Sequence, residues 1–192
     1  MEIRPSRSVS YAYYLSHLEE MCGVLSYGRD CIDECDPMFV NPFTKKSIVV
    51  VCTDEAINAA KPHKDCLDKN HKEIKTTCVD SCGEVRILRD EISKLNNLVI
   101  EKSNASVLQE ELYAVRNSEC KTIKCMARCS QKQFEKRCGN ETSVYFKQYF
   151  TQVLDAGKED LLATRKPDEL LNPKLSECTY ALNTSEIFNE KH

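Results

Sequence analysis

Twelve cysteines are the residues of this chain with the most conspicuous chemistry. A thiol can act as a nucleophile, bind a metal or form a disulfide, and an even count leaves none over if all of them pair. Three units have the spacing C-x3-C, and they are Cys31/Cys35, Cys78/Cys82 and Cys125/Cys129.

Residues four apart on a helix point in nearly the same direction. The two sulfurs of one unit are therefore badly placed to bond each other and well placed to face another helix. We predict that each unit reaches across to a different helix and that all twelve cysteines form disulfides, with the connectivity left open. The predicted disulfide cysteines are Cys22, Cys31, Cys35, Cys52, Cys66, Cys78, Cys82, Cys120, Cys125, Cys129, Cys138 and Cys178.

Metal binding is the rival use of cysteine. The chain has no C-x2-C, the turn that structural zinc sites most often use. The set closest to a zinc site is Cys52, His63, Cys66 and His71, and its histidines can equally belong to a solvated, lysine-rich helix face. We predict no metal and no cofactor, and an intracellular metal-binding helical protein stays as an alternative hypothesis.

The sequence contains few features that are typical of an enzyme active site. Tyr27-Gly28 followed by Cys31, and His63 followed by Cys66, resemble parts of secreted phospholipase A2. In that family an acid beside the histidine binds calcium, whereas Lys64 stands here and would repel the cation. G-x-S-x-G, Walker A and H-E-x-x-H motifs are absent as well. We predict no catalytic residues, with a degenerate phospholipase A2-like hydrolase as the second alternative.

Cysteine usage and glycosylation motifs indicate the compartment. Twelve thiols have a plain structural use in an oxidising environment. Three N-glycosylation motifs, at Asn104, Asn140 and Asn183, agree with that environment. The N-terminal segment shows no apolar run of the kind a signal peptide needs, and no stretch approaches the ~18 apolar residues of a membrane span. From the cysteines and the glycosylation motifs, and not from the N-terminal segment, we predict a secreted or extracellular glycoprotein without a membrane span.

Apolar residues recur at helical spacing through most of the chain. The pattern predicts a helix ending near Gly28, a short element over 31–35, and a helix from Pro62 to Gly83. Residues 84–116 predict one or two amphipathic helices with a polar bend at 102–106. Another helix is expected from Cys120 to Gly139.

Further predictions concern the end of the chain. Phe146, Phe150 and Leu154 predict a buried aromatic face on a helix that ends at Gly157. We expect one disulfide-rich helical domain over 1–157, with 84–118 as a helical insertion, and a C-terminal helix and tethered tail over 158–192. The fold class predicted is all-α, a disulfide-rich antiparallel bundle of about five to seven helices with a long central helix or helical hairpin.

Charge indicates a candidate binding surface. The net charge of −3 argues against a nucleic-acid carrier. Residues 121–137 nevertheless carry six basic residues against one acid. Lys121, Lys124, Arg128 and Lys132 step by three and four along the predicted helix, so they line one face and are candidate polyanion-binding residues. The alternative is a solvated face balanced by the acidic C-terminal region.

Several fragments together resemble a known family. They are C-I-D-E-C-D-P-M-F from Cys31, C-L-D-K-N-H-K-E-I-K-T-T-C-V-D-S-C from Cys66, and C-K-T-I-K-C-M-A-R-C from Cys120 with R-C-G at the end of that helix. This framework, over about 22–157, is similar to the nematode chondroitin proteoglycan 4 domain family, and a second cysteine-rich helical nematode domain family has similar spacing.

The resemblance implies a secreted, non-catalytic extracellular matrix or proteoglycan-core-type protein with a polysaccharide or protein partner. The chain contains no Ser-Gly dipeptide, the site at which chondroitin is attached. We therefore do not predict that it carries chondroitin.

Overall fold

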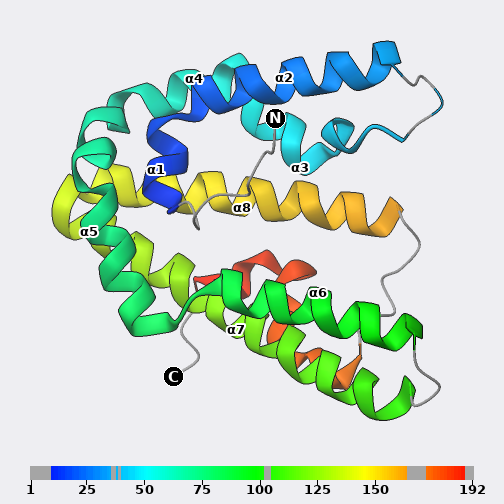
Figure 1. Cartoon of the computed structure of the whole chain (residues 1–192). Helices are drawn as coiled ribbons and strands as arrows, with labels where there is room; N and C mark the ends of the chain where they lie inside the picture. Colours follow the sequence, from blue (N-terminus) through cyan, green and yellow to red (C-terminus); the bar gives the residue numbers. More distant parts are fainter. Residues whose placement is uncertain (1–9, 36–37, 39, 102–104, 164–171, 189–192) are drawn as a thin grey trace.

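The computed structural model describes residues 10–35, 38, 40–101, 105–163 and 172–188 (Figure 1). These residues form helices and connecting turns without a β-strand. The α-helices are α1 (Tyr11–Ser16), α2 (Leu18–Cys35), α3 (Lys46–Val49), α4 (Asp54–Ala60), α5 (Lys64–Cys82), α6 (Val85–Glu101), α7 (Ala105–Cys138) and α8 (Asn140–Ala163). The 3₁₀ segments are η1 (Pro42–Thr44), η2 (Val50–Cys52), η3 (Lys61–His63), η4 (Pro173–Ala181) and η5 (Thr184–Ile187). The predicted all-α, disulfide-rich class is confirmed.

Proline and glycine set the limits of the long helices. Pro62 lies in η3, directly before α5, and Gly83 ends α5 with a φ of 88°. Gly139 ends α7 in the same way, with a φ of 89°. A left-handed backbone is open to glycine at little cost, so both helices stop where the sequence predicts.

Two other glycines do not end a helix. The predicted stop near Gly28 is wrong, because α2 continues from Leu18 to Cys35. A Cβ at Gly28 would lie 3.1 Å from Cε2 of Phe43, so the glycine admits that ring against the helix. The predicted end at Gly157 is also wrong, since α8 runs on to Ala163.

The long helices pack as antiparallel neighbours around α7 (Figure 1). α6 and α7 form the expected hairpin, whose bend at 102–104 lies outside the described residues. α5, α8 and η4 also pack on α7, while α1 packs on α5 and α3 on α8. Because α7 continues unbroken through residue 118, the expected insertion and the Cys120–Cys138 segment share one helix.

Aromatic side chains fill the centre of the molecule. Phe134 and Phe146 are fully buried with ring centroids 4.8 Å apart in an edge-to-face arrangement, and Phe150 is 8% exposed. Burying each such ring stabilises the fold by roughly 1.5 to 3 kcal/mol. The predicted aromatic face of α8 therefore belongs to the core.

The C-terminal segment was expected to be a tethered loop, and it is more ordered than that. η4 and η5 place Leu175, Tyr180 and Ile187 in the core, where all three side chains are buried. The Cys120–Cys178 disulfide ties this segment to α7. The stretch 164–171, part of the expected last helix, lies outside the described residues.

Candidate functional site: a basic face on a stapled helix pair

Three disulfides join α5 to α7. They are Cys66–Cys138, Cys78–Cys129 and Cys82–Cys125, with Cα atoms 5.7, 5.6 and 5.6 Å apart. From one disulfide to the next, the residue number of the cysteine on α5 rises while that of its partner on α7 falls. The two helices therefore run antiparallel. Two of the C-x3-C units thus face each other across a helix pair, as their spacing predicts. The remaining disulfides are Cys22–Cys52 and Cys120–Cys178.

The third C-x3-C unit behaves differently. Cys31 and Cys35 are free, exposed thiols on α2, with their sulfur atoms 4.0 Å apart. The prediction that all twelve cysteines form disulfides is therefore not met at these two. The physical reason is that their side of α2 is exposed, so none of the other helices that the structure describes brings sulfurs to them.

The four predicted basic residues do lie together. Lys121, Lys124, Arg128 and Lys132 line a hollow of about 580 Å³ that also includes the Cys82–Cys125 disulfide and Glu177. The staples to α5 and the Cys120–Cys178 link fix the part of α7 that carries them. The residues of this hollow, called the basic face below, are the candidate binding site.

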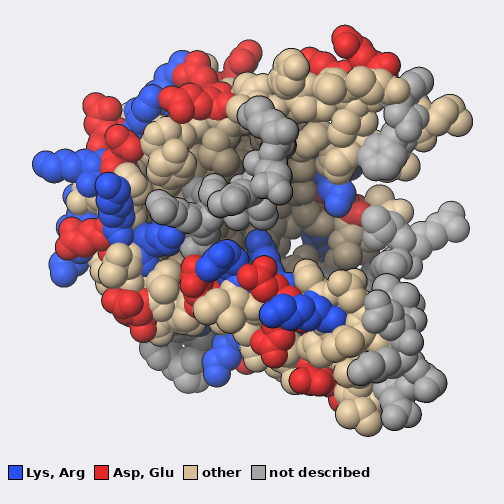
Figure 2. All heavy atoms as spheres, viewed as in Figure 1, with Lys and Arg blue, Asp and Glu red and all other residues tan. Residues whose placement is uncertain are grey.

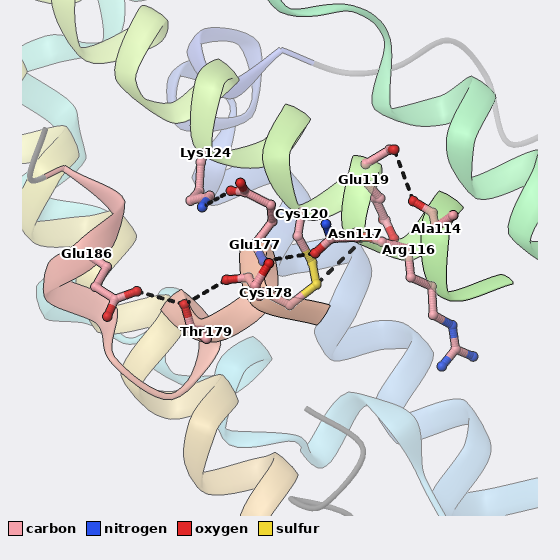
Figure 3. The surroundings of a disulfide bond; sticks show 12 residues. Ala114, Arg116, Asn117, Glu119, Cys120, Lys124, Glu177, Cys178, Thr179 and Glu186 are labelled. Atoms are coloured by element: carbon pink, nitrogen blue, oxygen red, sulfur yellow. Dashed lines mark hydrogen bonds and ion pairs between the residues drawn. A yellow bond between two sulfur atoms is a disulfide. The ribbon is translucent and has the colours of Figure 1, made fainter. Parts of the chain in front are cut away.

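Two of these cations hold the C-terminal segment in place. Lys124 forms an ion pair with Glu177 of η4 and is only 18% exposed (Figure 3). Arg128 donates hydrogen bonds to the backbone carbonyls of Ile187 (2.6 Å) and Glu186 (3.0 Å). Their positive charge is thus used in part for folding, a role that helical periodicity alone does not reveal.

Lys121 and Lys132 have exposed side chains at the same hollow. From Lys121 to Lys132 the helix advances eleven steps of about 1.5 Å, so the four positions cover about 16 Å. Glu177 reduces the positive potential at the centre of the stripe. Over the side of the molecule drawn in Figure 2, acidic and basic side chains are intermixed and no single charge dominates. An anionic chain would therefore meet exposed cations at the two ends of the stripe before it competed with Glu177 for Lys124.

The glycosylation motifs fall in different settings. Asn140 is exposed as the first residue of α8, and Asn183 is exposed before η5. The Asn183 side chain accepts a hydrogen bond from Ser185 at 2.9 Å and donates one to Glu186 at 3.0 Å. Asn104 lies outside the described residues. Exposed amides at Asn140 and Asn183 leave room for a glycan.

The alternative zinc site is overturned by the disulfides. Cys52 is bonded to Cys22, and Cys66 is bonded to Cys138, so neither sulfur remains as a thiolate ligand. Among the residues that the structure describes, no cluster of three or more Cys, His, Asp or Glu side chains could hold a metal ion.

His63, the residue on which the hydrolase alternative depends, packs against two residues of α8. Its Nδ1 lies 3.0 Å from the Thr142 hydroxyl, which itself donates to the carbonyl of Cys138. The ring stacks on Tyr145 with centroids 4.6 Å apart. Burial lowers the pKa of His63, against an opposing effect of Glu141. The imidazole thus contacts the Thr142 hydroxyl and the Tyr145 ring, and both contacts join η3 to α8.

The exposed thiols lack the activation expected of a catalytic cysteine, although thiols without it still undergo thiol–disulfide exchange. Hydrogen bonding with Cys35, together with the charge that Cys35 carries when ionised, raises the pKa of Cys31. A reactive cysteine needs the opposite shift, because the thiolate is the attacking species. Arg29, the cation nearest in sequence, is paired with Asp30 at 3.0 Å.

Fold and site together define a disulfide-rich, all-α protein with a rigid basic face. Five disulfides are typical of secreted or extracellular proteins. No helix in the described part of the chain is both long and apolar enough to cross a membrane. In comparisons with known proteins, the chain matches no family model, no curated protein and no solved structure.

Proposed function

We propose that this chain is a secreted, non-catalytic protein of the extracellular matrix type that binds a sulfated polysaccharide through the basic face. The three-disulfide staple between α5 and α7 is the observation that carries the proposal. It holds a row of cations on a helix that has little freedom to rearrange. The proposed kinship with nematode chondroitin proteoglycan domains rests on the cysteine spacing described above.

The same bonds support an oxidising location. Each disulfide stabilises a protein by about 2 to 4 kcal/mol, an advantage that persists only where thiols are not kept reduced. Ten cysteines committed to five such bonds leave no role for those sulfurs as reagents or ligands. This use of ten of the twelve cysteines supports the proposed structural, non-catalytic role.

Sulfated polysaccharide suits the basic face for two physical reasons. Its sulfates repeat along an extended chain, and a stripe of about 16 Å offers several contacts to one chain at once. Each contact is weak in water and screened by salt, so the stripe rather than any single lysine determines affinity. A rigid stripe also loses little conformational entropy on binding.

The test is retention on immobilised heparin and chondroitin sulfate at about 0.15 M salt. Lys121→Glu/Lys132→Glu removes the exposed ends of the stripe and leaves Lys124 and Arg128 to hold the C-terminal segment. The matched control, Lys69→Glu/Lys72→Glu, makes the same charge change at exposed positions of α5. We expect the first variant to lose retention and the control to keep most of it. Equal elution of both variants would refute a specific role for the basic face.

Intact mass spectrometry under non-reducing conditions tests the compartment separately. Protein from a secreting eukaryotic culture should show five disulfides within the chain and glycans at one or more of Asn104, Asn140 and Asn183. Mostly reduced cysteines in the natural protein would overturn secretion, whatever the heparin result.

A further inference from the structure

The C-terminal half of α2 presents an apolar stripe to solvent. Val24 is 72% exposed and Tyr27 is 77% exposed, and the free thiols of Cys31 and Cys35 continue the row. Steps of three, four and four residues put these side chains on one face of the helix. The half-buried Leu25 and Ile32 lie roughly a quarter turn further round the helix, and Gly28, which contacts the Phe43 ring, lies between them and Cys35. In Figure 1 this half of α2 forms the top edge of the molecule.

The molecule itself shows how C-x3-C helices pair. On α5 and α7 two such units meet in antiparallel orientation and form Cys78–Cys129 and Cys82–Cys125, with both Cα pairs 5.6 Å apart. The first cysteine of each unit bonds the second of the other. An approximate two-fold axis between the two bonds relates one C-x3-C unit to the other. Two identical units, one from each of two chains, can therefore form the same pair of disulfides.

We propose that the α2 stripe is the interface of a homodimer, closed by disulfides from Cys31 to Cys35 of the partner subunit and from Cys35 to the partner subunit's Cys31. The two helices run antiparallel about an axis near residue 33. In this register residues 31–35 of the two helices overlap, and the exposed Tyr27 lies beside the end of the partner subunit's α2. The solvent-facing side of the last turn of α2 in one copy is thus covered by the same turn of the second.

The chemistry is thiol–disulfide exchange with an oxidised low-molecular-weight disulfide such as glutathione disulfide. One thiolate attacks the oxidant, forms a mixed disulfide and releases one reduced thiol. The facing thiolate of the other chain then displaces the second reduced thiol. Two oxidant molecules are reduced to four thiols, and four protein thiols become two disulfides between the chains.

Closure within a single chain is the competing outcome. Neighbouring side chains four apart on a helix are nearly parallel, and the two sulfurs lie 4.0 Å apart where a disulfide needs about 2.05 Å. An internal bond would have to unwind the last turn of α2. A second helix supplies sulfurs from the opposite side with no such distortion.

The experiment uses the full chain in a glutathione redox buffer, read by non-reducing electrophoresis and intact mass. Wild-type protein should run at twice the chain mass and contain no free thiol. Cys31→Ser and Cys35→Ser should each stay monomeric when alone, because each removes one member of both bonds. Mixed in equal amounts, the two variants should form a cross-linked heterodimer through the remaining Cys31 and Cys35.

Three results would overturn the proposal. They are a wild-type monomer with a Cys31–Cys35 bond, a wild-type monomer with two free thiols, and cross-linking of either single variant with itself. Each result is independent of polysaccharide binding, since the basic face lies on α7.

A charge placed in the stripe tests the interface without touching sulfur. Tyr27→Glu should slow cross-linking about tenfold, because its carboxylate would be desolvated beside the end of the partner subunit's α2. Val107→Glu on α7 is the matched control, since Val107 is 70% exposed and lies outside the stripe. Equal rates for the two variants would show that the stripe makes no interface.

Discussion

The spacing C-x3-C occurs on α5, α7 and α2, and its fate differs between two regions of the molecule. In the stapled region, formed by α5, α7 and η4, the cysteines form four disulfides. In the open region, formed by the C-terminal half of α2 with η1 and α3, the two thiols stay free and exposed.

Polar contacts help to hold the open region together. Asn41 donates hydrogen bonds to the carbonyl of Arg29 at 2.9 Å and to Asp33 at 2.8 Å. Asp160 of α8 accepts hydrogen bonds from the backbone N–H groups of Lys46 and Ser47 at the start of α3.

The comparison of the two regions shows that local spacing sets the direction in which the sulfurs of a C-x3-C unit point. The packing of a second helix against that side decides whether they form disulfides.

The largest effect is expected from breaking the stapled region. Cys78→Ala/Cys129→Ala should lower the free energy of unfolding by about 2 to 4 kcal/mol, because the unfolded chain regains the freedom that this bond removes. Urea unfolding of isolated monomers, followed by circular dichroism, measures it. Cys31→Ser/Cys35→Ser should change the same quantity by less than about 0.5 kcal/mol. Similar losses for both pairs would abolish the distinction between the regions.

A second, smaller loss should follow removal of the guanidinium that holds η5. Arg128→Gln deletes charged hydrogen bonds to the Glu186 and Ile187 carbonyls, and should cost about 1.5 to 3 kcal/mol. Faster hydrogen exchange at 184–187 should accompany the loss. Lys121→Gln in the same row should stay within about 0.5 kcal/mol. If Lys121→Gln destabilised the chain as much, the claim that Arg128 supports the fold while Lys121 does not would be wrong.

In the open region, Asp160→Ala should cost about 1 to 2 kcal/mol, as expected for the loss of a helix cap. Burial opposes ionisation, yet the hydrogen bonds from Ser47 and Lys46 hold the pKa of Asp160 below its ordinary 3.8. The difference from wild type should therefore be full above pH 3.8 and fade as pH falls through the lowered pKa.

Glu159→Ala is the neighbouring control for Asp160. Its ion pair with Lys46 joins two side chains that are both more than half exposed, so its loss should be nearly neutral. A cost equal to that of Asp160→Ala would mean that general charge, and not the α3 cap, stabilises this region.

The smallest effect concerns His63, at the start of the stapled region. Because burial lowers its pKa below the ordinary 6.5, the unfolded chain binds more protons than the folded one as pH drops below about 6.5. Stability should fall with pH in that window and level off below the folded-state pKa. His63→Gln should flatten this part of the profile, measured by urea unfolding at several pH values. An unchanged slope would place the acid sensitivity elsewhere.

Local features were predictable from the sequence. Gly83 and Gly139 stop helices because an L side chain is strained at positive φ, and Phe146 and Phe150 are buried because steps of four gather them on one face. The row from Lys121 to Lys132 was found by the same periodicity. Gly28 and Gly157 misled the prediction, because a glycine inside a helix looks the same in sequence as one that ends it.

The candidate site was predictable only in part. Its four cations were identified, but the engagement of Lys124 with Glu177 and of Arg128 with Glu186 and Ile187 joins residues more than fifty positions apart. Nothing in the local pattern of α7 shows that η4 and η5 return to it.

The sequence by itself determined that the chain is helical and that each C-x3-C unit turns both sulfurs the same way, since both properties depend on neighbours within one or two turns. Only the tertiary structure decided that Cys78 and Cys82 meet Cys129 and Cys125 while Cys31 and Cys35 meet solvent. The physical reason is that a disulfide needs two Cα atoms about 5.5 Å apart. Helix packing across the whole chain sets that distance.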